Sequence, residues 1–218
     1  MPTATNGVAQ GATERVVISA PNFQTIRIPI IGTAPLVTAR FSTKATEMIR
    51  AKHEAGSTAK SKSAKAARDF RADFEGSMYT SPDGWHGVHA AAFRIAAIDA
   101  CRAAGYQMTR AKLAIFVVAD GDDAVEPVPL VRIFGRDPEQ YISHVRNATG
   151  VADLRCRALW PTGWRMDLTV RHDADMFTSA DVVNLIARVG LQVGIGEGRP
   201  YSKQSAGMGF GTFEIVRE

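Results

Sequence analysis

The amino-acid sequence predicts an α+β fold of the ferredoxin-like (RRM-like) type, in which two helices cover one face of an antiparallel sheet. Two segments alternate apolar and polar residues as half-buried strands do, and two others have the periodicity of helices. The best-marked elements follow one another as strand, helix, strand, strand, helix, strand, which is the order of a ferredoxin-like sandwich. We place these elements at residues 24–31, 88–103, 113–118, 164–172, 179–190 and 212–216.

The first half of this pattern rests on one alternating strand, one helix and one apolar run. Isoleucines occupy alternate positions of segment 24–31, where Pro29 indicates an edge strand or an outward-facing position. Segment 88–103 has small apolar residues on nearly every side and is followed by Gly105, as is typical of a buried helix. Segment 113–118 is apolar throughout and predicts a central strand.

A hairpin is predicted in the second half of the chain. Segments 151–159 and 164–172 both alternate, and the residues between them contain Pro and Gly, as a hairpin loop does. The second segment has apolar residues on one face, toward the core, and polar residues on the other. The polar residues are Arg165, Asp167, Thr169 and Arg171.

Shorter elements flank this hairpin. We expect a strand over 128–134 after an acidic hairpin turn with Asp120, Asp122 and Asp123, and a short helix over 138–145. The last helix has Thr178 as its N-cap, Asp181 at the capping-box position and Gly190 as a left-handed stop.

Length and composition are those of a globular protein, with 218 residues, 45% hydrophobic and 22% charged. We expect a flexible tail over 1–14 and a single domain over 15–218, with an insertion at 42–80. No apolar run reaches the ~20 residues of a membrane helix, and no signal peptide is evident, so we expect a cytoplasmic protein without membrane contact. The two cysteines lack metal-ligand spacing, and we expect neither a metal nor a cofactor.

The insertion is strongly basic. Eight basic and three acidic residues lie between Lys44 and Arg71, whereas the whole chain has a net charge of only +4. Such cations neutralise phosphates and release counterions, which gives sequence-independent affinity for nucleic acid. A solvated loop without a ligand is the alternative interpretation. The candidate nucleic-acid-binding residues are Lys44, Arg50, Lys52, Lys60, Lys62, Lys65 and Arg68.

A glycine-rich loop over 194–211 is the second candidate site. Glycine allows a ligand to approach the backbone closely, where exposed N–H groups hold phosphate oxygens. Alternatively, the glycines only permit turns. The spacing is neither that of a P-loop nor that of a dinucleotide fingerprint, because a strand rather than a helix follows. The candidate residues are Gly196, Gly198, Arg199, Lys203, Gly207 and Gly209.

The solvent face of the predicted hairpin is the third candidate site. Arginines at alternate positions of a sheet track a phosphate backbone or stack on bases. Salt bridges to Asp153 and Asp167 are the alternative, and the aromatic signature of an RRM is missing. The candidate residues are Arg155, Arg157, Arg165 and Arg171, with Arg27 beside them.

Histidine chemistry is the only catalytic option in the sequence. His86 and His89 flank the start of the predicted buried helix, but no carboxylate or cysteine completes a metal site with them. One of them would serve as general acid or base in metal-free RNA cleavage; capping is the other interpretation. We assign no catalytic residue and expect a binding protein rather than an enzyme.

The C-terminal sequence resembles a known family. The segments VVNLIARVGLQVGIGEGRP (182–200) and GMGFGTFEI (207–215) are similar to the helix, glycine loop and final strand of the RAMP superfamily of CRISPR-associated RNA-binding proteins. IGTAPLVTARFS (31–42), followed by the basic insertion, resembles the start of their backbone subunits, and the whole chain also looks like small proteins of bacteriophage genomes. The resemblance implies RNA held along the glycine loop and a basic protrusion, in a head-to-tail oligomer.

These observations predict a non-enzymatic protein that binds single-stranded nucleic acid, either RNA or single-stranded DNA, with little sequence preference. We expect it to act as a homo-oligomer or as a subunit of a nucleoprotein complex. Two other functions fit the sequence. One is a structural or assembly protein of a phage particle, and the other is a metal-independent endoribonuclease that uses His86 or His89.

Overall fold

The structure is a computed structural model that describes residues 18–40, 43–54, 56, 68–146, 150, 152–202 and 207–217. It has a mixed α+β fold whose strand pairs are all antiparallel within the described residues. The predicted tail over 1–14 lies outside this range. The helices are α1 (Thr43–Glu54), α2 (Phe70–Gly76), α3 (Ala90–Ala103), α4 (Met108–Ala114) and α5 (Ser179–Arg188), followed by a π-helical turn, η1 (Val189–Val193).

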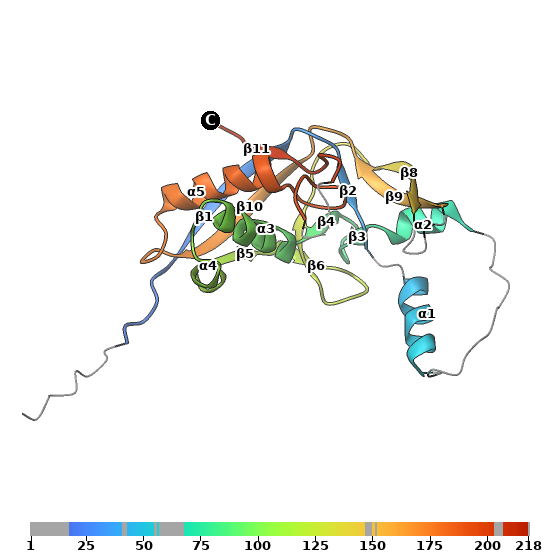
Figure 1. Ribbon diagram of the computed structural model, residues 1–218, viewed down its shortest axis with the longest axis horizontal. Coiled ribbons are helices and arrows are strands. Elements are labelled where there is room, and N and C mark those ends of the chain that lie inside the picture. Colours follow the sequence, from blue (N-terminus) through green and yellow to red (C-terminus); the bar gives the residue numbers. More distant parts are fainter. Residues whose placement is uncertain are drawn as a thin grey trace, which may run out of the picture.

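Sheet A is the base on which α3 and α5 pack (Figure 1). Its strands, in spatial order, are β11 (Phe213–Ile215), β1 (Phe23–Gly32), β10 (Arg165–Asp173) and β5 (Ile115–Val118). β1 pairs with β10 along most of its length, from Phe23 opposite Asp173 to Ile31 opposite Arg165. This register places the alternate apolar residues of both strands on the same inner face, as the sequence predicts.

The core lies between this inner face and the helices. Ile28, Ile30, Met166, Leu168 and Val170 are buried on the sheet side. They meet the alanine-rich face of α3 and the apolar stripe of α5, whose small and branched side chains let helices and sheet approach closely. Burial of this apolar surface is the main stabilising contribution to the fold.

Two smaller sheets extend from sheet A. Sheet B contains β2 (Leu36–Thr38), β9 (Ala152–Trp160) and β8 (Glu139–Arg146). Sheet C contains β3 (Tyr79–Thr80), β4 (His86–His89), β7 (Pro129–Arg132) and β6 (Gly121–Asp122). An isolated bridge between Phe134 and Arg165 links the end of β7 to the start of β10, so that sheets A and C continue into one another.

The predicted hairpin of segments 151–159 and 164–172 is wrong. Both segments are strands, but β9 pairs with β8 and β2 in sheet B, whereas β10 pairs with β1 and β5 in sheet A. The turn after Trp160 therefore carries the chain from one sheet to another instead of folding it back on itself. A short loop with Pro and Gly marks a change of direction and does not determine which strands pair.

Other predicted elements need smaller corrections. Segment 138–145 is the strand β8 and not a helix. Within 113–118 the strand begins only at Ile115, and it lies at the edge of sheet A rather than in its centre. Val88 belongs to β4, so the buried helix α3 begins at Ala90.

Helix α5 has the predicted start and a different end. Thr178 and Asp181 form the capping box, and hydrogen bonds from Thr178 hold the pKa of Asp181 below its ordinary value. Gly190 is not the left-handed stop. The helix continues as the π-helical turn η1 until Gly194, whose φ of 69° ends it. Gly190 is required by packing instead, because a Cβ there would overlap the carbonyl oxygen of Phe213.

Helix α1 belongs to the basic insertion. Its described side chains are all exposed, including Met48 and Ile49, and Figure 1 shows it apart from the sheets. Arg50 forms an ion pair with Glu54 on the helix surface. No helix among the described residues is long and apolar enough to cross a membrane.

Candidate nucleic-acid interface

The four predicted arginines of the hairpin lie on two different sheets. Arg155 and Arg157 project from β9 of sheet B, and Arg165 and Arg171 project from β10 of sheet A. Because these strands are not neighbours, the arginines do not form one continuous track. Each pair has its own surroundings.

Arg155 and Arg157 are both paired with one carboxylate, which offsets only one of their two charges. Nη1 of Arg155 lies 3.0 Å from Oε1 of Glu197, and Nε of Arg157 lies 3.0 Å from Oε2. Glu197 belongs to the glycine-rich loop, and its own N–H donates to the carbonyl of Val37 in β2. In the alternative interpretation of the sequence, these arginines form salt bridges with Asp153, whose partner is in fact Arg68.

Packing explains several glycines of the loop. A Cβ at Gly196 would lie 2.5 Å from the carbonyl oxygen of Val37, and one at Gly207 would overlap the carbonyl of Arg199. A Cβ at Gly198 would lie 2.9 Å from the ring of Phe210, whereas Gly209 faces open space. The loop also uses its own N–H groups. Those of Ile195, Glu197, Tyr201, Met208, Phe210 and Gly211 donate to backbone carbonyls.

N–H groups that already donate to carbonyls of the protein are not available to hold phosphate oxygens. We therefore attribute most glycines of this loop to its turns and close packing, and not to contact with a nucleic acid. Arg199, also on this loop, donates to the carbonyl of Gly196. Lys203 lies outside the described residues.

The basic insertion is described only in part. Arg68 forms ion pairs with Asp73 at 2.7 Å and Asp153 at 3.1 Å, and its hydrogen bond to Asp73 raises its pKa. It is therefore already neutralised. The backbone of Lys44 and Lys52 lies in α1, but their side chains are outside the described part, as are Lys60, Lys62 and Lys65 entirely.

The outer face of sheet A carries a cluster that the sequence did not reveal. Phe23 of β1 and Phe116 of β5 lie on either side of β10, with ring centroids 5.7 Å apart. The guanidinium of Arg171 lies 5.1 Å from the centroid of Phe23 and 5.3 Å from that of Phe116. Arg94 of α3 lies 4.7 Å from the centroid of Phe116. We call this outer face, with Phe23, Arg27, Phe116, Arg165, Asp167 and Arg171, the open face.

A second cluster continues the open face onto sheet C. Arg132 of β7 lies 4.9 Å from the ring centroid of Phe134 and 5.8 Å from that of Trp85. Phe134 is directly opposite Arg165 across the bridge between the two sheets, so both side chains point to the same side. The indole of Trp85 lies over Gly121, where a Cβ would come within 2.9 Å of it.

Within the described residues, the arginines at the two ends of the open face form no ion pair, whereas the arginine between them does. Among the ion pairs of the described residues, none involves Arg94, Arg132, Arg165 or Arg171. Between the two clusters, Arg27 pairs with Asp167 at 2.9 Å, as the alternative interpretation of the sequence anticipated. Arginines on aromatic rings keep their charge and present a flat, weakly hydrated surface.

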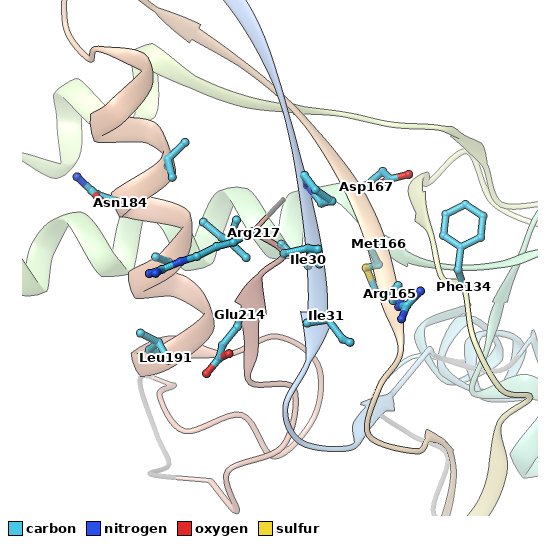
Figure 2. A pocket seen from close by; sticks show the side chains of 15 residues that line it. Ile30, Ile31, Phe134, Arg165, Met166, Asp167, Asn184, Leu191, Glu214 and Arg217 are labelled. Carbon is cyan, nitrogen blue, oxygen red and sulfur yellow. The ribbon is translucent and has the colours of Figure 1, made fainter.

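A hollow of about 1140 Å³ lies at the Arg165 end of the open face. Figure 2 shows Arg165, Asp167 and Phe134 on one side of Ile31, and Asn184, Leu191 and Glu214 on the other. Most of its lining is apolar, with a few charged groups around it, which is the usual composition of a ligand-binding hollow.

The histidines have structural contacts. Nδ1 of His89 accepts a hydrogen bond from the N–H of Ala91 and caps α3. Nδ1 of His86 lies 3.0 Å from Oγ1 of Thr80, and its ring packs against Trp160. The capping interpretation therefore holds for His89. In the described part of the chain, no group of three or more His, Cys, Asp or Glu residues is arranged to hold a metal.

The aromatic residues of the open face could not be found by motif, because they come from separate segments of the chain. Phe23 and Phe116 are 93 positions apart, and only the sheet register brings them to the two sides of Arg171.

In comparisons with known proteins, the chain matches no family model and no curated protein.

Proposed function

We propose that the protein binds single-stranded nucleic acid, RNA or single-stranded DNA, through the open face. The observation that carries this proposal is the pair of arginine–aromatic clusters, whose arginines lack carboxylate partners in the described residues. Arginine supplies charge for phosphates, and aromatic rings supply surfaces on which unpaired bases stack. The sequence resemblance to the RAMP superfamily is consistent with this function.

The proposal includes a ferredoxin-like domain. It is supported by the chain order β1, α3, β5, β10, α5, β11 and by the spatial strand order β11-β1-β10-β5, with α3 and α5 packed on the inner face. In this arrangement the outer face has no helix over it within the described residues. The face is therefore accessible to a polymer.

Its length suits several nucleotides. Arg165 and Arg171 are six residues apart on β10, which corresponds to about 20 Å along the strand. A ligand that contacts both clusters would run along β10 and pass the neutral Arg27–Asp167 pair. Rings and guanidinium groups do not distinguish one base from another by hydrogen bonds, so we propose little sequence preference.

The charge contribution is tested by the double variant R165Q/R171Q. We expect about a tenfold weaker affinity for a fluorescein-labelled single-stranded oligonucleotide and a salt dependence reduced by roughly two counterions, because two phosphate contacts are lost. Fluorescence anisotropy over a sodium chloride series measures both. R71Q/R136Q removes the same charge from exposed ion pairs elsewhere and should change affinity much less. Equal losses in both variants would show that only net charge matters.

The stacking contribution is tested separately by Phe23→Leu. Leucine retains apolar contact but removes the aromatic surface, so we expect about a fivefold or greater loss of affinity for single strands. Binding to a duplex of the same sequence should be weaker and should not respond to the substitution, because paired bases are not free to stack on the ring. The same anisotropy assay gives both values, and an unchanged single-strand affinity would remove Phe23 from the interface.

A further inference from the structure

A cluster of polar and charged side chains lies on sheet B, on the surface where the glycine loop meets β8 and β9. Tyr141 and Ser143 of β8 are directly opposite Arg157 and Arg155 of β9, so all four side chains lie on one face of the sheet. Glu197 lies over this face and contacts both arginines. The two guanidinium groups therefore converge on one point.

The surroundings leave room beside that point. A hollow of about 310 Å³ is bounded by Glu197, Tyr141, Ser143 and His144, and on the loop side by Phe210. The hydroxyl of Ser143 and the phenol of Tyr141 lie on this face, and the two guanidiniums that contact Glu197 lie beside the hollow rather than in its lining. These are donors of the kind that bind phosphate oxygens, and Glu197 is the one carboxylate among the residues lining this hollow.

The contact of Glu197 is not deeply buried. Its side chain is 28% exposed, and those of Arg155 and Arg157 are 41% and 23% exposed. Ion pairs at this level of exposure are weakened by water and salt, so another anion can compete for the arginines. The side chain alone must rotate away, because the backbone of Glu197 is held by its own hydrogen bond to Val37.

We propose that Arg155, Arg157 and Ser143 form a phosphate subsite and that Glu197 occupies it as an internal substitute for the phosphate group. A phosphate offers more acceptor oxygens than a carboxylate, and it therefore satisfies both guanidiniums and the hydroxyl together. Insofar as the phosphate belongs to a nucleic acid, this inference rests on the proposed function. A single-stranded nucleic acid bound at the open face would then also reach this subsite, where one of its phosphates would displace the Glu197 side chain.

Glu197→Gln is the direct test, with Glu139→Gln as a matched control. Both substitutions remove one negative charge that is paired with arginine. We expect E197Q to bind a fluorescein-labelled single-stranded oligonucleotide about fivefold to tenfold more tightly than wild type, and E139Q to differ by less than twofold. Adding R155Q and R157Q to E197Q should abolish the gain. A gain in affinity of the same size in E197Q and E139Q, or a gain that persists in the triple variant, would overturn the proposal.

Inorganic phosphate distinguishes the subsite from the proposed function. The melting temperature of E197Q should rise more in sodium phosphate than in sodium chloride of equal ionic strength, and wild type should show a smaller difference. Comparison of the two salts within one variant removes the effect of the lost ion pair on stability. A rise in phosphate without tighter oligonucleotide binding identifies free phosphate as the ligand. If R165Q/R171Q does not weaken oligonucleotide binding but E197Q responds to phosphate, the proposal for the open face is wrong and the proposal for the phosphate subsite is retained. No response of E197Q to either ligand would rule out the subsite.

Discussion

Replacing Asp123 by alanine is expected to lower the free energy of unfolding by about 3–5 kcal/mol, the usual cost of breaking a buried ion pair by removing one partner. The Asp123 side chain is 2% exposed and that of Arg40 is 7% exposed. Nη2 of Arg40 lies 3.2 Å from Oδ2 of Asp123 without the alignment of a hydrogen bond, so the contact is one of charge. Urea denaturation followed by circular dichroism measures the loss.

The carboxylate also organises the backbone around it. Oδ1 accepts from the N–H of Thr80, and Oδ2 accepts from the N–H groups of Val125 and Glu126. Asp123 thus joins β3 to the loop after β6, while Arg40 anchors the end of the segment that follows β2. The sequence predicted only a hairpin turn here, since nothing in the acidic run 120–123 indicates that one of its carboxylates is buried opposite an arginine.

Two further variants separate charge from backbone hydrogen bonding. Asp123→Asn keeps an acceptor oxygen but leaves the buried guanidinium of Arg40 without its partner. R40M/D123N removes both charges and should be more stable than D123N alone, because a buried apolar side chain then replaces an unpaired cation. If R40M/D123N instead has a lower free energy of unfolding than D123N alone, the ion pair is not the source of the stability.

The elements with strong local signals could be predicted from the sequence. Alternation fixes which residues of β1 and β10 face the core, and the capping box at Thr178 fixes the start of α5. Alternation within one segment does not show which other strand it pairs with. The sequence therefore wrongly predicted that β9 and β10 pair with each other. β8 was mistaken for a helix because its alternation is weak. It is an edge strand, and Ile142, which lies opposite the buried Cys156, is itself 46% exposed.

The candidate site, like the fold, could be predicted from the sequence only where the signal is local. The sequence correctly placed Arg165 and Arg171 on the exposed side of a strand. It could not show that Glu197 reaches Arg155 and Arg157, since a contact across 40 residues depends on how the loop crosses sheet B. It also could not assemble the open face, because Phe23, Phe116 and Phe134 meet the arginines only through the register of sheet A and the bridge to sheet C.

Replacing Gly211 by alanine is expected to be nearly as destabilising as the loss of Asp123. Its φ is +68°, a conformation that costs a residue with a Cβ about 1–2 kcal/mol. The added Cβ would also overlap the backbone carbonyl of Ile195, which cannot move aside as a side chain can, and overpacking of this kind costs about 1–3 kcal/mol more. The N–H of Gly211 donates to Pro35 and its carbonyl accepts from Ile195, so displacing it would release the loop.

Gly209→Ala is the matched control, and it decides what the glycines of this loop are for. Gly209 has a similar φ of +82°, but no atom lies within 4 Å of the position its Cβ would take. Both variants therefore share the conformational cost, and only G211A meets the backbone of Ile195. We expect thermal and urea unfolding to show a clearly larger loss for G211A. Equal losses would mean that these two glycines serve conformation alone, and that the close approach of Gly211 to the backbone of Ile195 contributes little to stability.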